Sequence, residues 1–287
     1  MIIVRIWEGL GNQMFQYAFA KALQEKGYCV RLDMDKAYNS PWFENKREDA
    51  RDNRLQCFNI TIPSVAVEEN KHYSFLRRSS IWEKGICFLA QNKMWPYGYY
   101  REKGAGYKDE LENIKGTWYL QGTFQSIRYF QDIREKLLRE FTPKKKIKIS
   151  NKLKEILKND NTVSIHIRRG DYVKINHALS VYYYRQAIAR IKEYVKNPFF
   201  VVFSDDTNWV KENLDLGMSS IYISDEKGLQ DFEELLIMSK CKSNIISNST
   251  FSWWGAWLNQ NPQKCVIAPK IWYDGQEELV LEDWIVV

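Results

Sequence analysis

The sequence lacks the features of several large protein classes. It has only 5 cysteines in 287 residues. They are widely spaced and include no C-x-x-C pair, which argues against a disulfide framework or a structural zinc site and for a reducing compartment. No apolar run approaches the roughly 18 residues of a membrane-spanning helix, and the first residues do not resemble a secretory leader. We therefore expect a cytoplasmic protein.

The composition also argues against disorder and nucleic-acid binding. Only 14 glycines and 7 prolines are present, whereas 45% of the residues are hydrophobic, so a sizeable core can form. The net charge of +6 is modest, and its densest run, at residues 144–148, follows Thr142-Pro143 as expected of a solvated linker. Because no nucleic-acid-binding motif accompanies this run, we expect no nucleic-acid partner.

Strands and helices alternate in the first half of the chain. Apolar runs predict strands, and apolar residues at helical spacing predict helices. The predicted strands are Ile2–Ile6, Tyr28–Asp33 and Thr117–Leu120, and the predicted helices are Met14–Lys26 and Ile127–Phe141. Residues from about 39 to 114 show no sustained period, so we expect an irregular, largely helical insertion there.

The second half repeats the alternation more regularly. Its predicted strands are Val163–Ile167, Phe199–Phe203, Ile221–Ile223, Asn244–Ser247 and, as the last one, Cys265–Ala268; its predicted helices are Val181–Val195, Trp209–Asn213, Gln230–Lys240 and Phe251–Leu258. Such alternation is typical of parallel sheets covered by helices on both faces. We expect an α/β protein of two Rossmann-like domains, residues 1–145 and 146–287, that face a central cleft.

Polar residues follow the strands of the second half. In open α/β sheets, ligands bind at the carboxyl ends of the strands, and His166, Arg168 and Arg169 lie at one such end. A guanidinium keeps its charge at any working pH and matches phosphate oxygens. Asp171 can orient an arginine or act as an acid. A salt-bridged turn is the structural alternative.

Two further segments have the same position in the pattern. Asp205 and Asp206 end a strand and could accept hydrogen bonds from ribose or guanine, or could simply cap a helix. The Ser247–Phe251 segment leads hydroxyl groups into a helix, whose first N–H groups and dipole favour anions; an ordinary cap is the alternative. Together, the arginine-bearing strand end and the hydroxyl-rich helix start predict diphosphate binding.

Five motifs resemble, in the same order, those of the bacterial α-1,2-fucosyltransferases of glycosyltransferase family 11. They are G-L-G-N-Q-M-F-Q-Y at 9–17, Q-G-T-F-Q-S at 121–126, H-I-R-R-G-D-Y at 166–172, F-S-D-D at 203–206 and S-N-S-T-F-S-W-W-G at 247–255. The resemblance implies a GT-B-like fold and inverting transfer of L-fucose from GDP-β-L-fucose to the 2-hydroxyl of a terminal galactoside. It implies neither a metal nor any other cofactor.

The resemblance also implies roles for individual residues. Arg168 would contact the donor diphosphate with His166 nearby, and the same donor would bind Ser249, Thr250 and Phe251. Gly11 and Asn12 would lie near the reacting sugar. With the residues argued from strand ends, the expected donor-binding set is Arg168, Arg169, Asp205, Asp206, Ser249, Thr250, Phe251, Gly11 and Asn12, and the catalytic candidates are Arg168, His166, Asp171 and Asn12.

The general base, the natural acceptor and the partner surface stay open. The family resemblance implies a galactose-terminated glycan of a surface polysaccharide, which can be lipid-linked, so peripheral contact with the inner face of a bacterial membrane is compatible with it. A fucosyltransferase of another linkage or acceptor is one alternative. A non-catalytic carbohydrate-binding protein is another, although it would not need arginine and hydroxyl phosphate sites.

Two motifs point to chemistry that we do not expect. Gly9-x-Gly11 follows a predicted strand, but the third glycine of a dinucleotide fingerprint is missing, so a nicotinamide enzyme is not predicted. Asp33-x-Asp35 matches the D-x-D pattern of metal-dependent transferases. Because it follows the second strand of the first half, away from the predicted donor side, we interpret it as a strand end and a helix start.

Overall fold

The computed structural model describes residues 1–34, 53–65, 85, 89, 98–217, 219–223, 226, 228–270, 272 and 277–287. Contacts divide these residues into two compact units, one within Met1–Lys144 and the other from Lys145 onward. Each unit is built around its own parallel sheet, which confirms the predicted α/β class.

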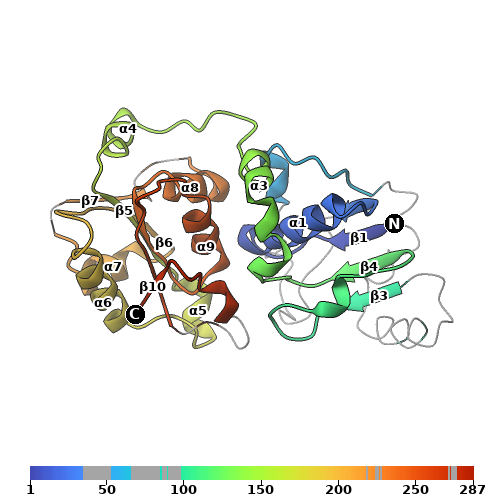
Figure 1. The fold of residues 1–287 in the computed structure, drawn as a ribbon. Helices are drawn as coiled ribbons and strands as arrows, with labels where there is room; N and C mark the ends of the chain where they lie inside the picture. The colour runs from blue at the N-terminus through green and yellow to red at the C-terminus, as the bar shows by residue number, and fades with distance from the viewer. Residues whose placement is uncertain are drawn as a thin grey trace. The chain divides into compact units, whose positions relative to one another are not determined.

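The described part of the first unit contains a sheet of four parallel strands in the order β2-β1-β4-β3; the neighbours β1, β4 and β3 are labelled in Figure 1. They are β1 (Ile2–Arg5), β2 (Val30–Asp33), β3 (Gly98–Arg101) and β4 (Trp118–Gln121). Helix α1 (Leu10–Glu25) follows β1 directly and is almost entirely buried. Its aromatic residues stabilise the unit from inside, because Phe19 stacks on Phe124 with ring centroids 4.1 Å apart.

Strand β3 corrects one sequence prediction. Gly98–Arg101 lie in the stretch expected to be a largely helical insertion, yet they pair in parallel with β4. The close approach depends on Gly98, because a Cβ there would lie 2.1 Å from the Trp118 ring. Elsewhere in this stretch the described elements are the short 3-10 helices η1 (Arg54–Cys57) and η3 (Asp109–Leu111); residues 35–52 and most of 66–97 lie outside the described part.

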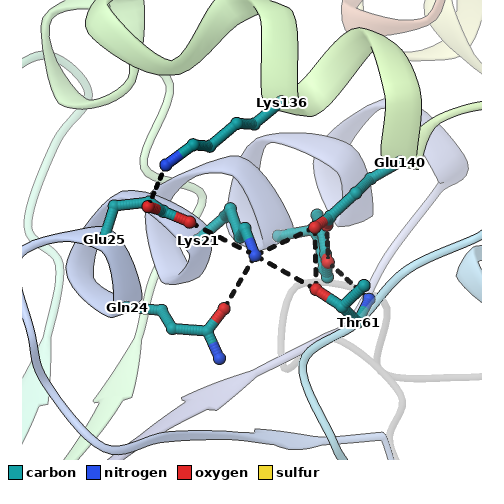
Figure 2. A network of polar contacts seen from close by, with 7 residues as sticks. Lys21, Gln24, Glu25, Thr61, Lys136 and Glu140 are labelled. Carbon is teal, nitrogen blue, oxygen red and sulfur yellow. Dashed lines mark hydrogen bonds and ion pairs between the residues drawn. The ribbon is translucent and has the colours of Figure 1, made fainter.

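A second correction concerns the helix predicted over Ile127–Phe141. The chain forms two 3-10 turns, η4 (Ile127–Tyr129) and η5 (Gln131–Ile133), before α3 (Arg134–Glu140) begins. Helix α3 is joined to α1 by a buried ion pair between Lys21 and Glu140, 2.9 Å apart. Figure 2 shows the network around it, in which Lys21 also donates to Gln24 and Thr61.

The second unit contains six parallel strands in the order β10-β9-β8-β5-β6-β7. They are β5 (Thr162–Ile167), β6 (Phe199–Ser204), β7 (Ser220–Tyr222), β8 (Ser243–Ile245), β9 (Val266–Ala268) and β10 (Ile285–Val286). Strand β10 extends the sheet beyond the strand predicted to be the last one, because Ile285 and Val286 pair with β9.

Helices cover both faces of this sheet. The α-helices among the described residues of the second unit are α4 (Asn151–Ile156), α5 (Gly170–Lys174), α6 (Val181–Ile191), α7 (Thr207–Asn213), α8 (Asp231–Met238) and α9 (Thr250–Trp257). Alternate residues of β6 divide between two cores: Phe200 and Val202 pack with α6, whereas Val201 and Phe203 pack with α4 and α8. This is the period of two expected of a buried strand.

The strand order creates one switch point in each sheet. In the second unit, β6 and β7 follow β5 on one side, and the chain then returns to place β8 on the other side. In the first unit, β2 and β4 flank β1 in the same way. Ligands of open α/β sheets bind at the carboxyl ends of strands beside a switch point. The ends of β5 with β8 and of β1 with β4 therefore occupy the positions expected of ligand-binding residues.

Candidate functional site

Arg168 follows the last residue of β5 and is held between two carboxylates. One terminal nitrogen lies 2.7 Å from Asp171 Oδ1, and the other lies 2.9 Å from Asp205 Oδ2. The Arg168 side chain remains 24% exposed. A partly exposed guanidinium with a fixed orientation can therefore meet an anionic ligand at the sheet edge.

The neighbouring Arg169 is fixed more firmly. Its backbone N–H donates to Asp205 Oδ1 at 2.8 Å, its Nε donates to Asp206 Oδ2 at 3.3 Å, and its guanidinium lies 3.8 Å from the centroid of a Trp209 ring. Asp206 also accepts from the backbone N–H of Trp209 as the N-cap of α7. The capping alternative considered for this residue is thus present in the structure.

Gly170 allows this cluster to close. A Cβ at this position would lie 2.8 Å from Asp205 Oδ2, the oxygen that contacts Arg168. With any larger residue here, the Asp205 carboxylate or the local backbone would have to shift. The glycine of the H-I-R-R-G-D-Y motif is therefore explained by close approach.

His166 connects the ends of β5 and β8 across the switch point. Its Nδ1 lies 2.9 Å from Ser247 Oγ, and its ring centroid lies 5.5 Å from that of Phe251. The ring is buried, and burial, together with the positive charge of Arg168, lowers the pKa of His166 to about 3. A buried, neutral imidazole is suited to hold the two strand ends together rather than to exchange protons with solvent.

The turn after β8 leads directly into α9. Ser249 is the N-cap residue, and its hydroxyl accepts from the backbone N–H of Phe251 at 3.4 Å. Ser247 and Ser252 hydrogen bond within the same turn, and Thr250 and Phe251 are partly exposed. The helix start beside His166 can therefore present N–H groups and a hydroxyl to an anion.

The charges at the carboxyl end of this sheet restrict which ligands can bind there. Two guanidiniums, Arg168 and Arg169, are paired with three carboxylates, Asp171, Asp205 and Asp206. A diphosphate would have to take over guanidinium donors from a carboxylate and draw on the helix start as well. A nucleotide can bind both kinds of charged group. Its phosphates accept hydrogen bonds from the arginine, and its hydroxyl or ring N–H groups donate to the carboxylates.

The first unit contains a matching arrangement at the ends of β1 and β4. Gln125, which follows β4, donates from Nε2 to Asn12 Oδ1 at 2.7 Å. Asn12 in turn donates to Glu8, which follows β1. Trp7 and Gln16 both donate to the Gly122 carbonyl. The motifs at 9–17 and 121–126 are thereby brought together.

The predicted site residues thus fall into two groups. The second unit brings together His166, Arg168, Arg169, Asp171, Asp205, Asp206, Ser249, Thr250 and Phe251, whereas Gly11 and Asn12 lie in the first unit. Sequence reasoning missed two polar residues of the first unit, Glu8 and Glu102. Both carboxylates follow strands, and strand-end position was the available signal, but Glu102 follows β3, which was not predicted.

The surroundings of Asp33 indicate a role in packing the first sheet. It is buried and accepts a hydrogen bond from the Tyr119 hydroxyl at 2.6 Å, and Asp35 lies outside the described residues. Within the part of the chain that the structure describes, no three His, Cys, Asp or Glu side chains are grouped as a metal site would require. In the same part, no helix combines the length and apolar character needed to cross a bilayer.

With this geometry in view, comparison with known proteins assigns the family. The sequence profile of glycosyl transferase family 11 matches residues 1–287. The chain belongs to this family. The resemblance inferred from the five motifs is confirmed, and this family 11 protein is a glycosyltransferase.

Curated relatives extend the family assignment. An Escherichia coli protein named O-antigen biosynthesis glycosyltransferase WbnK is 33% identical, covering 96% of this chain and 97% of its own length. An Escherichia coli alpha-1,2-colitosyltransferase is 32% identical over 96% of this chain and 94% of its own. Human galactoside alpha-(1,2)-fucosyltransferase 1 is 27% identical over 86% of this chain and 62% of its own.

Among solved structures, the fucosyltransferase NodZ from Bradyrhizobium is similar, with 12% sequence identity and a TM-score of 0.47, covering 88% of this chain and 91% of that one.

Proposed function

We propose that this family 11 enzyme transfers L-fucose from GDP-β-L-fucose to the 2-hydroxyl of a terminal galactoside, with inversion and without a metal. The observation that carries the proposal is the arrangement at the β5 and β8 ends, where the Arg168 cluster and the α9 start adjoin the contact between His166 and Ser247. We assign donor binding to the second unit and acceptor binding to the first.

The chemistry needs stabilisation of a leaving group. The acceptor oxygen forms a bond to the anomeric carbon of fucose, the bond from that carbon to the β-phosphate oxygen breaks, and its electron pair leaves with GDP. Negative charge therefore grows on the diphosphate in the transition state. Preoriented cations and N–H donors stabilise such charge without reorganising, and Arg168 and the first turn of α9 supply these groups.

The names of the relatives support linkage and acceptor class. The 32% identical relative is named for α-1,2 transfer of colitose, and the human relative is named for α-(1,2) transfer of fucose to galactosides. The 33% identical relative is named for O-antigen biosynthesis. We therefore propose a galactose-terminated glycan of a bacterial surface polysaccharide as acceptor. If the glycan is lipid-linked, the enzyme would meet it at the inner face of the membrane.

A second donor deserves a direct test because one of these relatives is a colitosyltransferase. The first experiment incubates the purified protein with lactose and excess EDTA, and with either GDP-fucose or GDP-colitose. Release of GDP with an α-1,2-fucosylated product supports the proposal. Turnover with GDP-colitose alone would replace the donor, and turnover only after manganese is added would refute metal independence.

Arg168 is the residue whose removal tests the mechanism. Arg168→Ala should lower kcat/KM for transfer by at least about 100-fold, the cost typical of losing a major electrostatic donor. Arg168→Lys keeps the charge but loses the planar fork, so it should restore only part of the activity. Arg190→Ala is the matched control, since Arg190 lies on α6 of the same unit and is 40% exposed. Near-normal transfer by Arg168→Ala would refute the role of Arg168 in stabilising the leaving group.

A further inference from the structure

Asn248 is a buried polar residue in the turn between β8 and α9. It is 4% exposed. It lies between Ser247, whose hydroxyl hydrogen bonds His166, and Ser249, the N-cap of α9. Because consecutive Cα atoms are about 3.8 Å apart, Asn248 adjoins both the contact that spans the switch point and the helix start assigned to the diphosphate.

The Asn248 amide has one orientation that its contacts allow. Its Nδ2 donates to the His177 carbonyl at 3.0 Å. A backbone carbonyl can only accept, so the amide nitrogen must face His177 and the amide oxygen must face the other way. The contact with His177 therefore fixes Oδ1 as a hydrogen-bond acceptor at this position.

In the described part of the chain, no group donates to Asn248 Oδ1, although this atom is buried. Buried polar atoms are nearly always hydrogen bonded, because an unpaired one has lost water without a replacement. Asn259, 2% exposed, shows the usual case in the same unit: its Nδ2 donates to Asn244 and to the Cys241 carbonyl, and its Oδ1 accepts from the backbone N–H of Asn261. Asn248 thus keeps an acceptor that a ligand can satisfy.

The contact between Asn248 and His177 also connects the two segments that carry the second unit's site residues. The backbone N–H of His177 donates to the Tyr172 carbonyl at 2.8 Å, and the Tyr172 ring centroid lies 5.5 Å from the guanidinium carbon of Arg168. The Asn248 side chain therefore links the turn after β8 to the segment that follows β5. A ligand that contacts both the Arg168 cluster and the α9 start lies beside it.

The chemistry of Oδ1 restricts the ligand group that it can bind. Phosphate oxygens are acceptors, as is Oδ1, so the partner of Oδ1 must be a hydroxyl or an N–H group. In GDP-fucose, the ribose and the fucose adjoin the diphosphate on its two sides, and both carry hydroxyls. Guanine is separated from the diphosphate by the ribose. Next to a diphosphate site, a hydroxyl of one of the two sugars is therefore the matching group.

We propose that Asn248 is a donor-binding residue whose Oδ1 accepts a hydrogen bond from a hydroxyl of the ribose or of the fucose beside the diphosphate. The Nδ2 contact with His177 holds the amide in the orientation that this role requires. The site thereby gains an uncharged contact that recognises a sugar rather than a phosphate. This inference rests on the proposed function and falls with it.

The experiment combines changes in the protein with changes in the ligand. Calorimetry gives the Kd of GDP, 2′-deoxy-GDP, 3′-deoxy-GDP and GDP-fucose for the wild type and for Asn248→Ala. If Oδ1 binds a ribose hydroxyl, removing that hydroxyl should weaken binding to the wild type roughly fivefold, the net value of one neutral hydrogen bond, and binding to Asn248→Ala less than about twofold. If Oδ1 binds fucose, the ratio of the Kd of GDP-fucose to that of GDP should rise roughly fivefold in Asn248→Ala.

The matched control is Asn259→Ala. Asn259 is an equally buried asparagine of the same unit, and both ends of its amide are partnered within the protein. Its replacement should lower stability and leave the ratios between the four Kd values at their wild-type levels. If Asn248→Ala does not fold, Asn248→Ser takes its place, because the shorter serine removes Oδ1 while keeping a polar group for the turn.

The ratios between ligands separate binding from structural support. A loss confined to one deoxy ligand assigns the ribose, and a change confined to the GDP-fucose ratio assigns the fucose; either result supports the proposal. If the Asn248 variant weakens all four ligands by the same factor, Asn248 only supports the fold and the proposal is overturned. A wild type that binds neither GDP nor GDP-fucose refutes the proposed function instead.

Discussion

The hydrogen bond between His166 and Ser247 joins two strand ends that lie 81 residues apart in the sequence. It spans the switch point between β5 and β8, so the segment bearing Arg168 and the turn before α9 are linked by one buried contact. The imidazole is neutral in this environment because burial disfavours the charged ring. That requirement has a measurable consequence.

The first prediction is an acid-sensitive stability due to His166. Its pKa is lowered to about 3 in the folded protein from a usual 6.5. Between these values the unfolded chain binds a proton that the folded chain does not, so stability rises with pH across this window and is lost as the pH falls. The slope is about 1.4 kcal/mol per pH unit. His166→Asn should remove this contribution.

Denaturant unfolding from pH 7 to pH 4 measures that contribution. The wild type should lose stability more steeply than His166→Asn, and the difference between the two should shrink as the pH falls. The asparagine amide can still hydrogen bond Ser247, so the variant isolates titration from contact. Parallel pH curves for the two proteins would contradict the buried, neutral assignment.

The second prediction concerns the conformation of Glu8. Because a non-glycine residue at φ +67° carries strain, Glu8→Gly should stabilise the protein by about 1 kcal/mol despite losing the contact with Asn12. Thermal unfolding of the variant and the wild type, compared at one pH, tests this. A less stable Glu8→Gly would show that the contacts of the Glu8 side chain outweigh the backbone strain.

Much of the fold follows from local pattern. The buried runs at β1 and β6 are almost continuous in apolar residues, β5 alternates Val163, Ile165 and Ile167 with polar residues, and α1 has apolar residues at helical spacing, so these elements can be predicted without knowing their neighbours. Strand β3 is different. Gly98–Arg101 contain a glycine and an arginine. They form a strand because they hydrogen bond to β4 in parallel, and because Gly98 leaves room for the Trp118 ring. The sequence of these four residues carries no information about a pairing strand that lies 20 positions further along the chain.

The candidate site divides in the same way. Arg168, Asp205 and Ser249 could be predicted because each follows a predicted strand, and parallel strands end at one edge. The contact between Glu8 and Asn12 could not be predicted, since it depends on the backbone angle of Glu8 and on a side chain that folds back onto it. The pairing of Arg168 with two carboxylates likewise depends on Gly170 admitting Asp205.

The third prediction tests the buried ion pair of the first unit, Lys21 with Glu140 (Figure 2). Both residues are less than a tenth exposed. Lys21→Met leaves Glu140 charged and buried, and should lower the free energy of unfolding by about 3 kcal/mol. Adding Glu140→Gln removes the stranded charge and should recover most of the loss. Urea unfolding of the two single variants and the double variant measures this, and simple additivity would contradict a coupled pair.

The last prediction concerns the charge balance around Arg168. Asp171 contacts the guanidinium while 40% of its side chain remains accessible, and its charge opposes that of an incoming diphosphate. Asp171→Asn keeps the side chain's shape and frees the guanidinium, so GDP should bind roughly fivefold more tightly, about 1 kcal/mol, with the gain shrinking at high salt. Calorimetry with GDP measures this, and Asp160→Asn, at a 95% exposed side chain of the same unit, is the control. If Asp171→Asn instead binds GDP more weakly, Asp171 serves to hold Arg168 in the orientation that the phosphates require. The sign of the change therefore decides whether this carboxylate competes with the donor or prepares its site.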